Sequence, residues 1–293
     1  ETNSVKRKRA ELPSNMAHAL PTKGEWLSKR YVVNNYILLD LLGTGSYAEV
    51  RLCKEKSTDD LFAVKILNKS VMQKRKVGQA STAMDDVKRE IAIMKRLSHP
   101  HVLRLYEVMD DPKVNKLYLV LEYMRRGDLM KIQQGDSKAY SCERLGEVDT
   151  WRVTRQVALG LQYLHSQDII HGDIKPQNLL VGDDGVVKIA DFGISKMLSG
   201  GDKLVDTAGT PAFMSPELCD GKQYSGRLAD VWAFGGTMFM LRFGRPPFLA
   251  PQVLQLYYKI INDPLEFPAD AAPVDEGLRD MLGAMLTKDP SDR

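Results

Sequence analysis

Strand-forming segments fill the first third of this chain, and helix-forming segments fill most of the remainder. Five short runs in the first third have the alternation or apolar character of β-strands, and one longer run has the spacing of an amphipathic helix. The predicted strands are 36–42, 49–54, 61–67, 103–109 and 117–123, and the helix is 84–97. Helical spacing then recurs in 148–165, 227–241, 251–261 and 276–286. This order predicts an α+β fold with a small five-stranded antiparallel lobe, a connector and a larger, mainly helical lobe.

The composition permits a large core and excludes several classes of function. Of the 293 residues, 43% are hydrophobic, and 41 basic side chains nearly balance 38 acidic ones. Such a balance gives no strong field for nucleic acid or a membrane surface, so we expect neither as a partner. The three cysteines are widely spaced and odd in number, so neither a disulfide framework nor a zinc site fits them, which favours a reducing compartment. No apolar run reaches the roughly 20 residues of a membrane-spanning helix.

Residues 1–30 are polar, lack periodicity and include the basic run 6–9. This composition is typical of a disordered tail, although a nuclear address is an alternative interpretation of the basic run. We therefore expect a folded domain at 31–293, divided into a small lobe (31–122), a connector (122–127) and a large lobe (128–293). We expect the protein in the cytoplasm, with the nucleus as the alternative.

Two features of the first third are suited to binding a nucleotide. Gly43 and Gly45 lie between two predicted strands, where glycine lets backbone amides approach phosphate oxygens. An ordinary hairpin turn is the alternative interpretation. Ala63 and Lys65 share one face of the next strand, because side chains alternate along a strand. Ala63 leaves room for a flat purine while Lys65 reaches the phosphates; an exposed lysine without such a role is the alternative.

Glu90 lies on the apolar side of the predicted helix, between Val87, Ile91 and Met94. A buried carboxylate without a cationic partner is costly, so this position calls for a basic side chain. Lys65 is the candidate partner. The alternative is that Glu90 lies at the edge of the helix in solvent.

Two polar strings in the large lobe supply groups for chemistry. Residues 171–178 read His-Gly-Asp-Ile-Lys-Pro-Gln-Asn, and Asp191-Phe192-Gly193 follows a short apolar strand. Asn178 and Asp191 offer the oxygen ligands that Mg²⁺ prefers. Asp173 can orient a hydroxyl group and accept its proton, and Lys175 can neutralise a phosphoryl group.

In this order and spacing, the motifs resemble the signature set of the protein kinases, over about residues 36–293. The resemblance implies a bilobal fold that transfers the γ-phosphoryl group of ATP, with Mg²⁺, to a protein hydroxyl. The implied catalytic residues are Asp173, Lys175, Lys65 and Glu90. The implied nucleotide-binding residues are Leu42, Gly43, Gly45, Ser46, Val50, Ala63, Lys65, Glu122, Met124, Asp128, Asn178 and Asp191, of which Asn178 and Asp191 would bind the metal.

The resemblance also assigns roles around the connector and in the large lobe. Glu122 and Met124 would offer backbone groups to adenine, Asp128 would lie near the ribose, and Leu121 would limit the pocket behind the base. Asp230 would hold the catalytic loop. One further ion pair is implied, between Glu217 and Arg293.

Lys175 and Thr210 resemble the serine/threonine class of kinases. Within that class, the strings 170–182, 188–193 and 207–214 are most similar to the calcium/calmodulin-dependent protein kinase kinases. That similarity implies substrates that are other kinases, phosphorylated on their activation loops. We expect the protein to be a monomer. The similarity also implies that calmodulin would bind only through a segment absent from this sequence.

Two positions depart from the family pattern. Ala48 replaces the third glycine of the phosphate loop, and Gly172 stands where the family usually has arginine. That arginine meets a phosphate on the activation segment, so its loss predicts that phosphorylation of Thr207 is not the main switch. The alternative is that Lys88 or Arg89 receives the phosphate.

The same departures leave a pseudokinase or scaffold as the alternative function, against which the intact catalytic and metal-binding residues argue. A small-molecule kinase is a third alternative, but it would lack the segment 209–217, which the resemblance identifies as a shelf for peptides. The sequence also stops before the final helix that the family usually has, so we expect a fragment.

Overall fold

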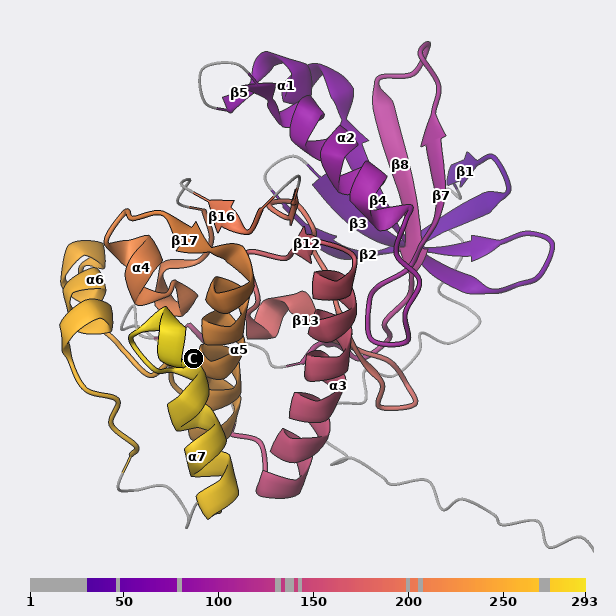
Figure 1. Ribbon diagram of the computed structural model, residues 1–293. Helices are drawn as coiled ribbons and strands as arrows, with labels where there is room; N and C mark the ends of the chain where they lie inside the picture. The colour runs from indigo at the N-terminus through magenta and orange to yellow at the C-terminus, as the bar shows by residue number, and fades with distance from the viewer. Residues whose placement is uncertain are drawn as a thin grey trace, which may run out of the picture.

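The computed structural model describes residues 31–45, 48–77, 81–129, 133–134, 140–141, 144–198, 201–204, 208–268 and 275–293. These residues form a small lobe, rich in strands, above a larger and mainly helical lobe (Figure 1). The predicted tail at 1–30 and two residues of the predicted sites, Ser46 and Thr207, lie outside the described residues.

The small lobe is built on one antiparallel sheet with the strand order β1-β2-β3-β4-β8-β7. Its strands are β1 (Tyr31–Val33), β2 (Tyr36–Thr44), β3 (Ala48–Glu55), β4 (Leu61–Asn68), β7 (Leu105–Asp110) and β8 (Lys116–Glu122). All five predicted strands are present, and β1 adds a sixth at the edge. The pattern did not reveal β1 because the strand is short and its first two side chains are exposed.

Two helices pack on this sheet. Helix α2 (Ala83–Met94) begins at Thr82 with a capping box, in which the Thr82 and Asp85 side chains each accept a backbone N–H of the other residue. Its buried side includes Glu90, as predicted. The short α1 (Lys69–Lys74), which the pattern did not predict, is capped by the Asn68 side chain. A small ladder of β5 (Lys76–Val77) and β6 (Ser81–Thr82) joins the two helices.

Helix α5 (Gly226–Phe243) runs through the middle of the large lobe, with α3 (Glu147–Ser166) on one side and α4 (Pro216–Cys219) and α6 (Val253–Asn262) on the other (Figure 1). It starts at Ser225, whose side chain accepts the N–H of Leu228, and stops at Gly244, whose φ of 77° suits glycine. From Trp232 to Phe243 every side chain is buried. Helix α7 (Glu276–Met285) packs against it.

Short strands and turns join these helices. A three-stranded sheet consists of β14 (Val187–Ile189), β13 (Leu179–Val181) and β9 (Gly127–Asp128). Three further pairs of short strands are β12 (Ile169–Ile170) with β15 (Lys196–Met197), β16 (Lys203–Leu204) with β17 (Tyr224–Ser225), and β10 (Gln133–Gln134) with β11 (Tyr140–Ser141). Single 3₁₀ turns form at Pro176–Asn178, Pro211–Phe213 and Pro290–Asp292.

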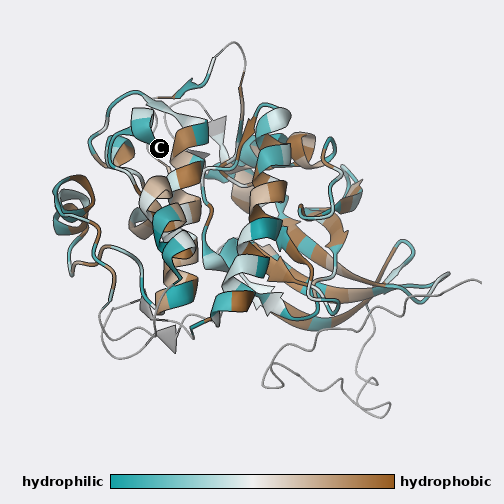
Figure 2. Cartoon of the chain, turned by 60° about the horizontal axis from the view of Figure 1, so that its bottom comes forward, coloured by the Kyte–Doolittle hydropathy of each residue, from teal (hydrophilic) through white to brown (hydrophobic). Residues whose placement is uncertain are grey.

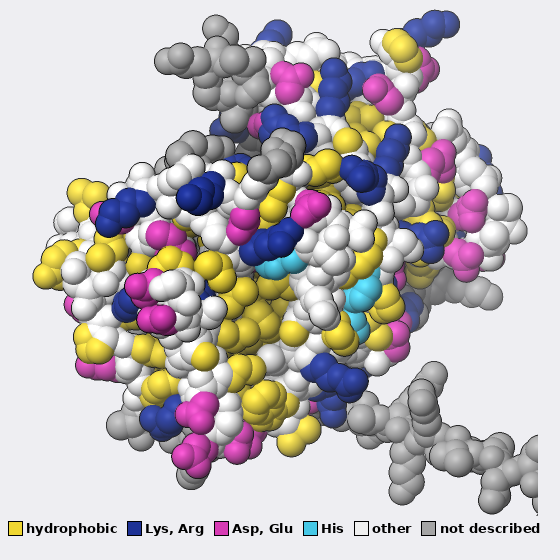
Figure 3. Space-filling model, viewed as in Figure 1, with side chains coloured by type: hydrophobic (Ala, Val, Ile, Leu, Met, Phe, Trp, Pro, Cys, Tyr) yellow, Lys and Arg dark blue, Asp and Glu magenta, His cyan; other side chains and the backbone are white. Residues whose placement is uncertain are grey.

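One apolar cluster continues from the small lobe into the large lobe. It includes Ala63 and Leu121 of the sheet, Met124 of the connector, and Leu179 and Phe192 beyond it. Figure 2 shows the matching pattern, with largely hydrophobic strands and large-lobe helices of mixed character. On the face seen in Figure 3, basic and acidic side chains are interspersed around an apolar area on the large lobe. Among the described helices, none has the length and hydropathy needed to span a membrane.

Candidate active site

Lys65 and Glu90 join the sheet of the small lobe to its helix. Lys65 Nζ donates to Glu90 Oε1 at 2.8 Å, and the two side chains are 23% and 6% exposed. Burial by itself lowers the pKa of Lys65, but the carboxylates of Glu90 and Asp191 outweigh it and hold that pKa above its ordinary value. The predicted pair is therefore formed, and Asp191 of the large lobe lies near enough to act on the same ammonium group.

The turn between β2 and β3 carries the predicted phosphate loop. Gly45 N–H donates to Ala48 O at 2.7 Å, which closes the turn. A Cβ atom at Gly43 would meet nothing within 4 Å, so glycine there leaves open space beside the backbone. Leu42 is exposed at the rim and Val50 is partly buried against the main apolar cluster. Ser46, predicted to bind the nucleotide, is not among the described residues.

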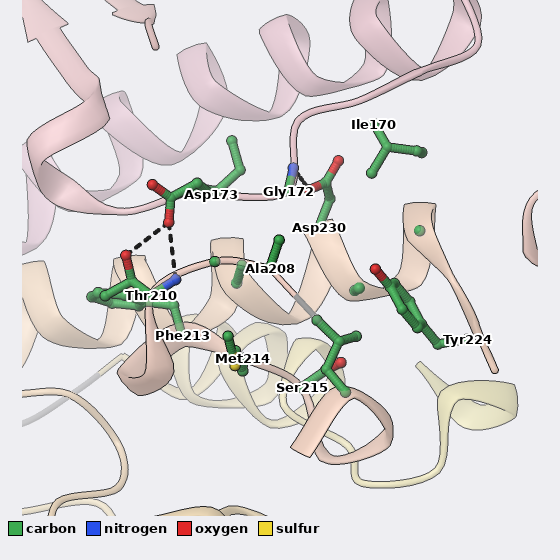
Figure 4. Close-up of a pocket in the computed structure, with 16 residues that line it drawn as sticks. Ile170, Gly172, Asp173, Ala208, Thr210, Phe213, Met214, Ser215, Tyr224 and Asp230 are labelled. Atoms are coloured by element: carbon green, nitrogen blue, oxygen red, sulfur yellow. Dashed lines mark hydrogen bonds between the residues drawn. The ribbon is translucent and has the colours of Figure 1, made fainter. Parts of the chain in front are cut away.

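Asp173 lies at the centre of a small network of charged and polar groups. Its Oδ2 accepts from Lys175 Nζ at 2.5 Å and from Asn178 Nδ2 at 3.1 Å. Its Oδ1 accepts from the Thr210 hydroxyl at 2.8 Å and from the Thr210 N–H at 3.1 Å, as Figure 4 shows. Lys175 also donates to the Thr210 hydroxyl, at 2.8 Å. The loop that carries Asp173 and the segment beginning at Gly209 are therefore fixed to each other by one carboxylate.

The sequence did not predict that Thr210 belongs to this network. There, Thr210 served only to indicate the serine/threonine class of kinases. Its position follows from the 3₁₀ turn Pro211–Phe213, which starts directly after it. The available signal was the string Gly209-Thr210-Pro211, but nothing in that string shows which loop the hydroxyl reaches.

Asp191 adopts a left-handed backbone conformation with a φ of 65°, which is uncommon for aspartate. Its Oδ1 accepts the N–H of Gly193 at 3.4 Å. The next residue, Phe192, is 1% exposed and packs edge-to-face on His171, with 5.3 Å between ring centroids. The buried phenylalanine anchors the turn, so strain at Asp191 is maintained by packing, as is common at functional sites.

The carboxylate of Asp230 anchors the loop that precedes Asp173 by hydrogen bonds to its backbone. Its carboxylate accepts the N–H of His171 at 2.9 Å and the N–H of Gly172 at 2.8 Å. His165 Nε2 lies 2.9 Å from the same carboxylate. Asp230 is 1% exposed and belongs to the second turn of α5, so the loop that leads to Asp173 is attached to the helix at the centre of the large lobe.

The connector between the lobes is attached to the large lobe by ion pairs. Lys188 Nζ of β14 donates to Glu122 Oε2 at 2.8 Å. Arg125 pairs with Asp183 at 2.9 Å, beside the turn before β14. The N–H of Glu122 donates to a carbonyl of the small lobe, Arg104 O, at 3.0 Å. The N–H is therefore not free for a nucleotide. The backbone group of Glu122 that suits the amino group of a base is its carbonyl, because an amino group needs an acceptor.

The other predicted residues of the nucleotide site surround this connector. Ala63 and Leu121 are paired across β4 and β8, and both are buried beside Met124 in the main apolar cluster. Asp128 lies in β9, opposite Leu180. The apolar side chains thus line up behind the connector, which is the arrangement that a flat, hydrophobic ring requires.

Far from this site, Arg293 and Glu217 form a buried bidentate ion pair. The two nitrogen–oxygen distances are 2.8 and 3.1 Å, and the side chains are 0% and 9% exposed. Arg293 also donates to the carbonyls of Leu228 and Thr287 and lies over the Trp232 ring, 5.1 Å from its centroid. The predicted pair is therefore part of the core of the large lobe.

A small, partly open pocket of about 30 Å³ lies between the loop that carries Asp173 and residues 208–215 (Figure 4). Ile170, Tyr224 and Ser215 line it, together with the backbone at Gly172 and Gly209. This volume holds a water molecule and is far too small for a nucleotide. Lys65, Glu122 and Met124 of the predicted nucleotide site are not among the residues that line it.

The donor set at the site fits one hard cation when phosphate completes its shell. Asn178 uses its amide nitrogen in both of its hydrogen bonds, to the backbone carbonyl and the Oδ2 of Asp173, which leaves its oxygen for a cation. Asp191 supplies a carboxylate near Lys65. No cluster of three or more His, Cys, Asp or Glu side chains suited to a metal occurs among the described residues. Mg²⁺, which is usually held by one or two protein oxygens together with substrate phosphates and water, matches such a partial set.

Comparison with known proteins agrees with this geometry. The protein kinase domain family matches residues 36–293. The chain is 40% identical over 274 residues to serine/threonine-protein kinase GRIK2 of Arabidopsis thaliana, which covers 92% of this chain and 65% of that protein. It is 40% identical over 287 residues to a calcium/calmodulin-dependent protein kinase kinase of Caenorhabditis elegans (91% and 52%) and 42% identical over 279 residues to serine/threonine-protein kinase ssp1 of Schizosaccharomyces pombe (91% and 42%).

The chain thus spans between about two fifths and two thirds of the length of these relatives. The family match includes every element that carries the network around Asp173 and the Lys65–Glu90 pair. The chain therefore belongs to the protein kinase family, and within it to the serine/threonine-protein kinases.

Proposed function

We infer that this chain transfers the γ-phosphoryl group of ATP to serine or threonine hydroxyls of other protein kinases, on their activation loops. The observation that carries the catalytic part is the network in which one carboxylate, Asp173, contacts Lys175, Asn178 and Thr210. The similarity to a protein kinase kinase supports the choice of substrate.

Lys65 holds the α- and β-phosphates of the nucleotide in this proposal. The ion pair with Glu90 fixes the direction of its ammonium group and keeps it charged, because the pKa of Lys65 is raised. The glycines of the β2–β3 turn bring backbone amides to the same phosphates. A fixed positive charge needs no reorganisation when the terminal phosphoryl group leaves.

Asp173 orients the attacking hydroxyl and accepts its proton. The carboxylate is only 14% exposed, and each of its oxygens already accepts two hydrogen bonds, which fixes its rotamer. Lys175 lies beside it and neutralises charge on the phosphoryl group in transfer. Proximity of this kind supplies most of the rate in phosphoryl transfer, because the loose transition state needs little covalent help.

Asn178 and Asp191 would hold Mg²⁺. When bound, the metal neutralises charge on the β- and γ-phosphates and orients them. The protein's contribution is to present the two oxygens from elements that are themselves fixed, a 3₁₀ turn after the catalytic loop and the turn anchored by Phe192.

Another kinase as the substrate is the finer part of the proposal. One relative carries such a role in its name, the calcium/calmodulin-dependent protein kinase kinase of Caenorhabditis elegans. A second is named for activating another protein, SNF1-activating kinase 1 of Saccharomyces cerevisiae, and is 37% identical over 315 residues. The strings that support the likeness lie around the catalytic loop and the segment 208–214. Both elements would face the incoming hydroxyl.

The test is a radiolabelled phosphate-transfer assay with Asp173→Asn as the matched control. The acceptors are an inactive kinase domain with its activation-loop threonine, the same domain with that threonine changed to alanine, and a generic basic protein. We expect label on the first acceptor, and a loss of roughly 10²-fold or more in the Asp173→Asn variant, the scale for one preorganised charge. Label on the basic protein alone would limit the function to a kinase of other substrates. ATP binding without any Asp173-dependent transfer would indicate a pseudokinase.

A further inference from the structure

Helix α3 buries one side and exposes the other. The buried side packs against α5, β12 and β14. On the opposite side, Val148, Trp151 and Leu159 are 72%, 37% and 39% exposed. These three side chains lie on one face, because an α-helix turns once in about 3.6 residues. No labelled helix or strand lies in front of α3 in Figure 1, so this apolar face is left open.

The face forms one wall of a broad, open groove of about 600 Å³. His101, Arg152 and Arg155 line the groove together with the three apolar side chains. None of the residues that line it belongs to the nucleotide site or to the network around Asp173. Exposed apolar side chains are ordinary when they are scattered, but a gathered patch in a concave surface is typical of an interaction site. The groove therefore has the form of an interaction site, and it is separate from the active site.

Hydrogen bonds to β14 and the turn before it fix the groove from beneath. Gln156 of α3 accepts the N–H of Val187 at 2.9 Å and donates to Gly185 O at 3.5 Å. His101 Nδ1 lies 3.0 Å from Val187 O, and the carbonyl of His101 accepts the N–H of Ile189 at 3.0 Å. The groove is thus set before any partner binds, which removes an ordering cost that weakens many contacts.

The charges in the groove decide which kind of partner suits it. Arg155 is exposed and makes no ion pair or hydrogen bond with a described residue. Arg152 is 41% exposed and pairs with Asp149 at 2.6 Å, but Asp149 does not line the groove. None of the described residues that line it is acidic. Guanidinium groups bind carboxylates through charged hydrogen bonds, so the complementary partner is acidic as well as apolar.

The same charges argue against two other occupants. Residues 1–30 of this chain include the basic run 6–9, which Arg152 and Arg155 would repel. Two copies of this face would bring the arginines of both copies together. A segment of another protein is therefore the occupant that the charges favour. Positions 148 to 159 extend over roughly 16 Å along the axis, which suits an α-helix of about three turns laid along α3.

We propose that the outer face of α3 is a docking surface for an acidic, amphipathic helix of a partner protein. Apolar side chains of that helix pack on Val148, Trp151 and Leu159, and its carboxylates bind Arg155 and Arg152. Docking there leaves the nucleotide and acceptor sites open, because it uses none of their residues. The proposal goes beyond the proposed function, and it holds whether or not the partner is also the substrate.

The experiment selects the partner sequence without assuming it. A phage library of random peptides of about 16 residues, long enough for three helical turns, is selected on the wild-type chain after depletion on a Trp151→Ala/Arg155→Glu double variant. The enriched peptide is synthesised with a fluorophore, and fluorescence anisotropy gives its dissociation constant for wild type and for each single variant. Lys222→Glu is the matched control, because it reverses an exposed basic residue that follows α4 and does not line the groove. Thermal unfolding establishes that each variant is folded.

We expect the enriched peptides to carry Asp or Glu beside Leu, Ile or Phe at helical spacing. Trp151→Ala should weaken binding by roughly 30-fold or more, the loss for an aromatic residue at the centre of an interface. Arg155→Glu should weaken binding by roughly 10-fold or more, because a like charge then faces the carboxylates. A peptide with lysine in place of its key glutamate should bind Arg155→Glu better than wild type, and Lys222→Glu should bind the original peptide as wild type does.

Three results would overturn the proposal. One is a selection that yields no peptide whose binding depends on Trp151 or Arg155. Another is an enriched sequence that is basic or uncharged. The third is a dimer of the chain in solution that Trp151→Ala or Arg155→Glu abolishes, which would assign the face to a second copy. If Trp151→Ala does not fold, the charge exchange at Arg155 decides by itself. None of these measurements requires turnover, so a failure of the proposed function would leave this test intact.

Discussion

Replacing Glu90 by glutamine removes one charge from the nucleotide site while keeping the shape of the side chain. Glu90 is 6% exposed and lies 2.8 Å from Lys65 Nζ. In the variant, Asp191 is the carboxylate that still acts on Lys65. The ammonium group is then free to turn from its direction toward the phosphates.

The structure sets the expected size of the loss. Two unit charges about 4 Å apart attract each other by about 4 kcal/mol at an effective dielectric constant of about 20. Lys65 is 23% exposed, so water recovers part of that energy when the carboxylate is lost. A net loss of about 2.7 kcal/mol in transition-state stabilisation corresponds to roughly 10²-fold in kcat/KM.

The pH dependence gives a second, independent readout. Because Glu90 is one of the groups that raise the pKa of Lys65, its removal lowers that pKa, and burial then favours the neutral amine. The alkaline limb of the profile of kcat/KM for ATP should therefore move to lower pH in Glu90→Gln, and Glu90→Asp should restore part of the shift. The expected loss of kcat/KM is roughly 10²-fold. If Glu90→Gln lost only about threefold or less, and the alkaline limb of its pH profile did not move, this account of the ion pair would be wrong.

Three further predictions concern the connector and the large lobe. Lys188→Met breaks the contact with Glu122 and should raise the KM for ATP by roughly 10-fold or more, the effect of losing one charged hydrogen bond of about 1.5 kcal/mol or more, while kcat changes little; Lys188→Arg should rescue it. Arg293→Ala strands a buried carboxylate and should lower the free energy of unfolding by about 3 kcal/mol in urea titrations; a loss below about 1 kcal/mol would refute this. Burial lowers the pKa of Lys288 from 10.5 to about 8, so the unfolded chain binds more protons between these values and stability rises with pH through that window; Lys288→Met should lose the rise when unfolding is compared at the two ends.

The main helices and strands could be predicted from the spacing of hydrophobic residues, because the positions that are buried in a helix or strand recur at a fixed period. The strands 61–67 and 117–123 became β4 and β8 with bounds shifted by one residue. Both are central in the sheet and bury consecutive apolar side chains, because each of their two faces packs against an apolar cluster. Strand β1 and helix α1 escaped prediction. Each has few residues and depends on neighbours, β1 on pairing with β2 and α1 on the cap from Asn68.

The site could be predicted where a residue's own chemistry demands a partner. Glu90 on an apolar helix face required a cation, and Lys65 supplies it. The ion pairs of Lys188 with Glu122 and of Arg125 with Asp183 carried no such signal, because each side chain would be satisfied equally well by water. Only the folded chain brings those pairs together.

The left-handed backbone at Gly172 affects the conformational strain of the loop before Asp173. A side chain in this left-handed conformation would cost on the order of 1–2 kcal/mol, and glycine avoids that expense. The backbone at Gly172, in the loop that leads to Asp173, is consequently not strained. Alanine at this position would be strained by its backbone rather than by crowding, because the atom nearest to an added Cβ, Ile194 O, would lie 3.6 Å away.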